Sequence, residues 1–134
     1  MTAYPVETVR VNELGKNQLS TLKRRTGIKN WNVLCRWAVC RSLAEASMPA
    51  AQDSGPMSNV EMTWQTFAGR HGELYAALIA ARCESDRLGN DPETIAEQFR
   101  LHLQRGLTYL VGDDQTRSFA GLASLASKTS IANA

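Results

Sequence analysis

The sequence predicts a mainly α-helical fold with one or two short β-strands. Apolar residues recur at helical spacing over most of the chain, and only two short stretches alternate with the period of two that is typical of strands. Asparagine, aspartate and proline stand where helices would begin, and glycines stand where they would end. Of the 134 residues, 43% are hydrophobic and 21% charged, which indicates a globular protein. The length suits a single domain over residues 1–134.

A strand followed by two helices is predicted at the start of the chain. Residues 6–11 are rich in β-branched side chains and roughly alternate, which favours a strand. Asn12 can cap a first helix that ends at Gly27. Asn30 can cap a second helix over residues 31–46. This order of elements resembles the start of ribbon-helix-helix proteins.

The first two helices distribute their apolar side chains differently. In the first, Leu14, Leu19 and Leu22 fall within one arc, and we expect this arc to face the core. In the second, apolar side chains lie on almost every side, which is typical of a helix that is central or shared with another subunit. Cys35 and Cys40 lie among these apolar neighbours, so both thiols are expected to be buried.

A loop and a second strand separate this region from two further long helices. Residues 47–59 contain two prolines, one glycine and three serines, which predicts a flexible loop. Residues 60–67 alternate with period two and predict a strand. The next helix is predicted over residues 73–86, with Leu74, Leu78 and Cys83 toward one side and Tyr75 and Ile79 adjoining.

The last long helix has a clear beginning. Asp91, Pro92 and Glu93 stand in the order of N-cap, first-position proline and first-turn acid. Gly112 should end it. Its inward stripe is expected to consist of Ile95, Phe99, Leu103, Gly106 and Leu110. A short helix over residues 116–126 and a frayed tail over residues 127–134 are expected to follow.

Basic residues are concentrated in the first third of the chain. Residues 1–45 contain eight Lys or Arg and three acids, a net charge of +5, whereas the whole chain carries +2. Such an asymmetry favours a polyanionic partner. On a helical projection Lys16, Lys23 and Arg24 lie opposite the leucines, interspersed with small polar residues, as is usual for a face that contacts phosphates. An ordinary solvated helix face is the alternative.

No residue set predicts an active site or a bound cofactor. Three cysteines without a Cys-x-x-Cys pair and two histidines lack the spacing of a zinc site, so no metal is expected. Unpaired cysteines suit the reducing cytoplasm, and no apolar stretch is long enough to span a membrane. We interpret His102 and Arg105 as structural rather than catalytic, with Gly106 permitting a close helix approach.

Several segments resemble the DndE family of the bacterial DNA phosphorothioation system. They are LKRRTGI at 22–28, Trp31-Asn32, LCR at 34–36, SLA at 42–44, Trp64 with FAG at 67–69, and HLQRG at 102–106 with Tyr109-Leu110. The resemblance spans roughly residues 8–111. It implies a DNA-binding oligomer in a machinery that replaces a non-bridging phosphate oxygen of DNA with sulfur, while separate proteins supply the redox chemistry and the energy.

We therefore expect a non-catalytic, cytoplasmic homo-oligomer, a tetramer by this resemblance, that works with the other phosphorothioation proteins. It should bind the backbone of double-stranded DNA, nicked duplexes included, without base specificity. The resemblance supports Lys23, Arg24 and Arg25 as DNA contacts, and helix geometry adds Lys16 and Lys29. The alternatives are a scaffold for the modification enzymes, a sulfur relay through Cys35 or Cys40, and a nuclease.

Overall fold

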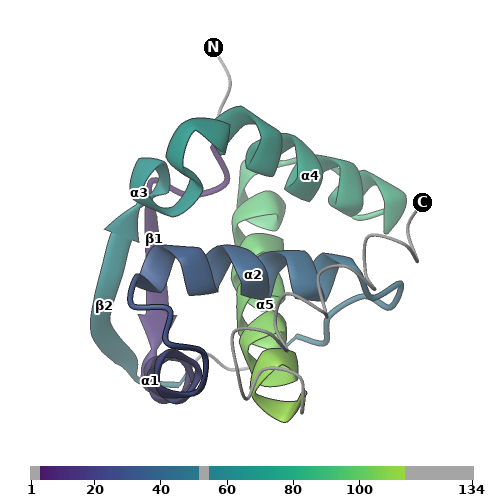
Figure 1. Cartoon of the computed structure of the whole chain (residues 1–134). Helices are drawn as coiled ribbons and strands as arrows, with labels where there is room; N and C mark the ends of the chain where they lie inside the picture. Colours follow the sequence, from purple (N-terminus) through teal and green to yellow (C-terminus); the bar gives the residue numbers. More distant parts are fainter. Residues whose placement is uncertain (1–3, 52–54, 114–134) are drawn as a thin grey trace.

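The computed structural model describes residues 4–51 and 55–113, which are mainly helical with two short strands (Figure 1). In chain order the elements are β1 (Thr8–Asn12), α1 (Glu13–Thr26), α2 (Trp31–Leu43), β2 (Met57–Thr63), α3 (Trp64–Ala68), a 3-10 turn (Gly69–His71), α4 (Gly72–Ser85) and α5 (Pro92–Gly112). This order confirms the predicted fold class, including its strand-helix-helix start and two later long helices. The helix and tail predicted after residue 115 lie outside the described residues.

Local caps place the helix boundaries where the sequence predicts them. Asn12 caps α1, its Oδ1 accepting a hydrogen bond from the backbone N–H of Gly15 at 2.7 Å. Gly27 ends α1 in the left-handed conformation, with a φ of 76°. Asp91 caps α5, and its carboxylate accepts from the N–H of Thr94 at 3.1 Å. The exception is α2, which ends at Leu43 rather than at residue 46.

The two strands pair with each other within the chain. β1 and β2 are antiparallel, with Val9 opposite Met62, and the register shifts between Arg10 and Asn12. The sheet buries Val9 and Val11 against the helices. β1 thus finds a partner strand in its own chain, whereas a ribbon that fills the major groove in ribbon-helix-helix proteins is shared by two subunits.

The prediction of a second strand over residues 60–67 is wrong at both ends. β2 covers Met57–Thr63, and the chain then turns into α3. Thr63 makes this turn, because its Oγ1 accepts from the backbone N–H of Thr66 at 3.1 Å and caps the short helix. Trp64 and Phe67 share the buried side of α3 at helical spacing.

α2 and α5 cross at the centre of the molecule (Figure 1), and the crossing is closest at Gly106. A Cβ atom added to Gly106 would lie 1.7 Å from the carbonyl oxygen of Ala38, so only glycine permits this approach. Both residues are buried. The predicted inward stripe of α5 is confirmed, because Phe99, Leu103, Gly106 and Leu110 are buried. Its remaining member, Ile95, is half-buried.

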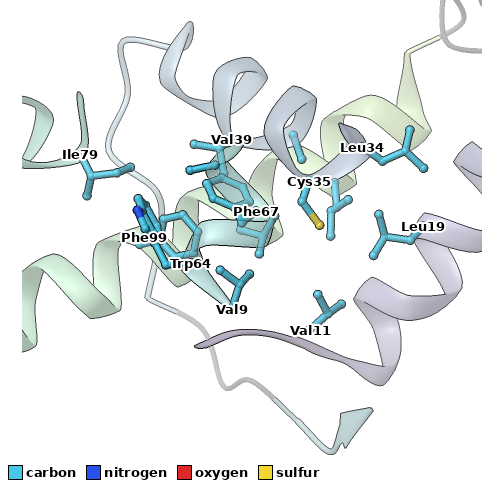
Figure 2. Packing of buried hydrophobic residues seen from close by; sticks show 14 of the residues in the cluster. Val9, Val11, Leu19, Leu34, Cys35, Val39, Trp64, Phe67, Ile79 and Phe99 are labelled. Atoms are coloured by element: carbon cyan, nitrogen blue, oxygen red, sulfur yellow. The ribbon is translucent and has the colours of Figure 1, made fainter. Parts of the chain in front are cut away.

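Three aromatic rings join α3 to α5. Figure 2 shows Trp64, Phe67 and Phe99 together at the centre of the buried cluster, beside Val9. The centroid distances from Trp64 to Phe67 and to Phe99 are 5.1 and 5.2 Å, and Phe99 meets both neighbours edge-on. These contacts hold α5 against α3, which directly follows β2.

α1 turns a slightly different face to the core than predicted. Leu19 and Leu22 are buried, but Leu14 is 56% exposed, so its predicted core position is wrong. Gly15 is buried instead, and a Cβ there would lie 2.5 Å from Val11 Cγ1 and 3.3 Å from the side chain of Gln104 on α5. A small residue is therefore required where α1 begins, and Leu14 lies away from the contact.

The predicted side of α4 is wrong in part. Cys83 and the adjoining Ile79 are buried, together with Ala76, whereas Leu74 and Leu78 are 54% and 40% exposed. Apolar side chains surround this helix, so its sequence does not select the face that packs. The face is set by tertiary contacts, such as the edge-on packing of Tyr75 against Phe67 of α3 and the hydrogen bond from Arg82 to the carbonyl of Leu43.

The α2–α5 crossing predicts a large cost for any side chain at Gly106. Gly106→Ala should lower the free energy of unfolding by about 3 kcal/mol, because the two backbones must separate. Gly112→Ala in the same helix is the matched control, since its Cβ meets nothing within 4 Å; its effect should stay within about 1 kcal/mol. Urea unfolding of both variants tests the pair. Similar midpoints would contradict the close crossing.

Candidate nucleic-acid interface

The exposed face of α1 carries the predicted basic residues of the first helix. Lys23 and Arg24 are exposed in its last turn, and Lys16 is half-buried near its start. The Lys23 Nζ lies 5.1 Å from the ring centroid of Trp31, a cation–π distance. The Lys16 Nζ donates a hydrogen bond to Asn59 Oδ1 at 2.8 Å. Within the described residues Lys16, Lys23 and Arg24 form no ion pair.

Lys16 and Lys29 line one open hollow of about 520 Å³, bounded by α1, the start of α2 and β2. Lys16 lies in the first turn of α1 and Lys29 just beyond its end, so it is a finding of the structure that both line one hollow. Asparagine side chains and Trp31 form much of the remaining lining, which thus offers hydrogen-bond donors and acceptors. One acid, Glu61, also lines it, and its carboxylate lies 3.6 Å from the guanidinium of Arg10.

The N-terminal end of α2 faces the same hollow. Asn30, the N-cap residue, makes no side-chain cap hydrogen bond, and the first turn contains no acid. Asn30, Trp31 and Asn32 all line the hollow. Since the start of a helix carries a partial positive charge, the potential of α2 adds to that of the two lysines. The hollow is therefore electropositive.

Arg25 differs from the other predicted contacts. It is half-buried, and its Nη1 donates to the backbone carbonyl of Val111 at 2.8 Å. This bond ties the end of α1 to the last turn of α5. The structure thus gives Arg25 a role in positioning α1, which no local sequence signal reveals.

A structural explanation exists for part of the basic cluster. Lys23, Arg24 and Arg25 occupy the last turn of α1, where cations interact favourably with the helix dipole by about 0.3–1 kcal/mol each. This explanation does not extend to Lys16 or Lys29, which lie outside that turn. Lys16 is held by its hydrogen bond to Asn59, whereas neither feature accounts for Lys29.

The cysteines do not have the surroundings of reactive thiols. Cys35 and Cys83 are buried as free thiols, and burial raises the pKa of Cys35 to about 12. Cys40 is exposed, which corrects the prediction of burial, because α2 turns it outward beside Tyr75 of α4. Desolvation still raises its pKa. Nucleophilic thiolates need the opposite shift, so these surroundings disfavour a sulfur relay.

His102 belongs to a buried polar cluster beside the α2–α5 crossing. Arg105 Nε donates to Ser42 Oγ at 2.8 Å, which leaves the Ser42 hydroxyl to donate to His102 Nδ1, also at 2.8 Å. This arrangement favours the neutral imidazole. Burial, with the positive charges of Arg82 and Arg105, lowers the pKa of His102 to about 4. The cluster supports the structural interpretation of His102.

Two arginines close the C-terminal end of α2. Arg105 donates to the backbone carbonyls of Ser42 and Ser47, each at 2.8 Å. Arg82 donates to the carbonyls of Leu43, Glu45 and Ser47, while its Nε holds Asp86 at 3.1 Å. Carbonyl groups that a helix end leaves without partners are thereby satisfied. These bonds also hold the chain as it leaves α2.

Neither a metal centre nor a membrane span occurs in the described part of the chain. Within residues 4–51 and 55–113, no three His, Cys, Asp or Glu side chains are grouped so that they could hold a metal ion. Among the described helices, none is both long and apolar enough to cross a membrane. The basic face and the adjoining hollow remain the candidate site.

Comparison with known proteins identifies the family. The family model of the DNA sulphur modification protein DndE matches residues 8–118. The chain belongs to the DndE family. This family is part of the DNA phosphorothioation system, as the sequence resemblance implies. No curated protein matches the chain.

Two solved structures share the fold. A DndE from Escherichia coli B7A, described as involved in DNA phosphorothioation modification, is 16% identical, with a TM-score of 0.63 over 78% of this chain and 96% of the other. A G21/24K mutant of DndE, described as involved in DNA phosphorothioation, is 14% identical, with a TM-score of 0.62 over 81% and 99% of the two chains. At such identities the likeness concerns the fold alone.

The buried His102 predicts a loss of stability in acid. The folded chain lowers its pKa from the ordinary 6.5 to about 4, so its contribution is complete above pH 6.5 and is lost as the pH falls towards 4. The full loss is about 3 kcal/mol. Urea unfolding at pH 7.5 and 4.5 should therefore show a drop about 2 kcal/mol larger for the wild type than for His102→Gln.

His71 provides the control for this measurement, because it is exposed and lies outside the cluster. His71→Gln should keep the wild-type dependence on pH. An equal drop in the wild type and in His102→Gln would show that His102 is not held neutral in the folded chain.

Proposed function

We propose that this DndE-family chain is a non-catalytic, DNA-binding homo-oligomer of the phosphorothioation machinery. It binds the backbone of double-stranded DNA through Lys16, Lys23, Arg24 and Lys29, without reading bases. It acts in the cytoplasm beside the other proteins of that system, as a single domain over residues 1–134. Arg25 serves mainly to hold α1 in place, because its guanidinium already binds α5.

One observation carries this proposal. Lys23, Arg24 and Lys29 are exposed, and within the described residues no carboxylate pairs with them. In a helix that is merely solvated, acids commonly alternate with bases at ion-pair spacing, but α1 contains a single acid, Glu13, at its start. A surface of unpaired cations favours a polyanion.

The hollow supports the same ligand. Lys16 and Lys29 approach it from two elements, and the N-terminal end of α2 adds partial positive charge. Helix starts of this kind commonly bind phosphate groups. We therefore expect a DNA phosphate at the hollow, with the α1 face following the strand on either side.

The oligomer follows from the small number of cations. Four charges neutralise few phosphates, and binding through so few contacts weakens quickly as salt rises. Several copies in one symmetric assembly multiply these contacts. A tetramer remains the expected assembly, since the family resemblance implies it.

A scaffold for the modification enzymes uses the same face in a different way. There the cations would dock on an acidic protein surface, and affinity for DNA would be weak. The raised thiol pKa values disfavour the sulfur relay, and no observation favours a nuclease. The affinity for DNA and its dependence on salt therefore separate DNA binding from the scaffold.

Neutralising the face should weaken DNA binding and its dependence on salt. In Lys23→Gln/Arg24→Gln/Lys29→Gln we expect the slope of log affinity against log salt to fall by up to about 2.7 in magnitude, at about 0.9 per lost phosphate contact. Gel shifts with one duplex over a salt series measure both quantities. Unchanged affinity would remove this surface from the DNA interface and favour the scaffold.

A matched control distinguishes the effect of this surface on DNA affinity from the effect of the total positive charge. Arg70→Gln/Arg87→Gln/Arg100→Gln removes three exposed cations from other parts of the molecule. This variant should bind DNA almost as the wild type does. An equal loss in both triple variants would show that total charge, rather than the α1 face, governs binding.

A nick should strengthen binding of the oligomer. A nicked duplex bends across several basic faces at less cost than an intact one. Competition between nicked and intact duplexes of the same sequence should therefore favour the nicked form. Equal affinities at every salt concentration would leave backbone binding in place but contradict the preference for nicks.

A further inference from the structure

α4 carries an apolar face that the described chain leaves uncovered. Leu74 and Leu78 are 54% and 40% exposed, one helical turn apart. Ala77 and Ala81 are also exposed and continue the same side of the helix. Most of the other large apolar side chains of the helices are buried or half-buried, so this stripe stands out as a surface for a partner.

We propose that this face pairs with α4 of a second copy of the chain, antiparallel and related by a two-fold axis. The proposal rests on the oligomer of the proposed function and names one of its interfaces. It replaces α2 as the expected shared helix, because the large apolar side chains of α2 are buried or half-buried within the chain.

The sizes of the side chains fit such a pair. An interface with two-fold symmetry must be complementary to itself. With the axis between Ala77 and Leu78, Leu78 lies opposite the partner's Ala77. The same axis sets Leu74 opposite the partner's Ala81. Each large side chain therefore faces a small one, which lets two helices approach closely and interlock.

The charges at the two ends also fit. His71 and Arg70 precede α4, Glu84 lies near its end, and all three are exposed. In the antiparallel pair the guanidinium of Arg70 lies near the partner's Glu84. A parallel pair would instead place the two Glu84 side chains together. Charge at the rim therefore selects the antiparallel arrangement.

The position of α4 is compatible with DNA binding. In Figure 1, α4 lies along the upper edge of the molecule and α1 at the opposite, lower end. Pairing through α4 thus leaves the basic face of each copy uncovered. The two faces of a pair would lie at its far ends, where they could contact separate stretches of DNA backbone.

Light scattering on the full chain without DNA tests the interface. The wild type should have the mass of at least two copies, and Leu78→Glu should lower that mass by half or more. Leu14→Glu is the matched control, because Leu14 is equally exposed but lies on α1; it should keep the wild-type mass. Circular dichroism should show that both variants are folded.

A charge exchange tests the orientation. Glu84→Lys should weaken association several-fold, because it places a like charge beside Arg70 of the second copy. Adding Arg70→Glu should restore much of the loss, since the two opposite charges are then exchanged. Absence of any recovery, with both variants folded, would overturn the antiparallel arrangement.

Two results would overturn the interface itself. An oligomer that survives Leu78→Glu must form through another surface. A monomeric wild type at high concentration would point to residues 114–134 of the same chain as the cover of α4. The outcome is independent of DNA binding, because the Lys23, Arg24 and Lys29 triple variant should keep the wild-type mass whether or not it binds DNA.

Discussion

The contact between the carbonyl of Ala38 and the α-carbon region of Gly106 sets the distance between α2 and α5, and the rest of the molecule is arranged around it. α5 also packs against α1 and α4, so a shift at this crossing would be passed to both. The polar cluster depends on it as well. Arg105 adjoins Gly106, and Ser42 lies one helical turn after Ala38, which is why the two side chains meet at 2.8 Å.

The same crossing fixes which end of α2 is open to solvent. The carbonyl groups at its C-terminal end accept hydrogen bonds from Arg105 and Arg82 of the same chain. Its N-terminal end has no side-chain cap and opens on the hollow that Lys16 and Lys29 line. Thus the negative end of the helix is neutralised within the fold, while its positive end is left to act on a ligand. The core and the candidate site are linked through one helix.

Local signals in the sequence predict most element boundaries, and long-range contacts decide what they miss. The caps at Asn12 and Asp91 act within one turn, so the starts of α1 and α5 could be predicted. The buried face of α4 could not, because it depends on distant parts of the chain, such as the carbonyls of Leu43 and Glu45 that Arg82 binds. The exposure of Leu14 could not either, because the neighbouring Gly15 packs closely against Val11, Asn12 and Gln104. Only part of the candidate site could be predicted from the sequence. The charge distribution predicts its basic residues, whereas the hollow could not be predicted because it forms only where β2 lies beside α1 and α2.

In the structure most arginines of residues 1–45 have partners within the fold, whereas the other cations are mainly lysines. Arg25, Arg36 and Arg41 bind acceptors within the fold, and Arg10 lies beside Glu61. The other four are three lysines and Arg24: Lys16 donates to Asn59, and Lys23, Arg24 and Lys29 form no ion pair within the described residues. Lysine is a flexible point charge, while the planar fork of arginine suits acceptors in a fixed arrangement, such as a base edge. A surface composed mainly of lysine is therefore better suited to the phosphate backbone than to reading bases, and its specificity must come from the shape of the DNA or from partner proteins.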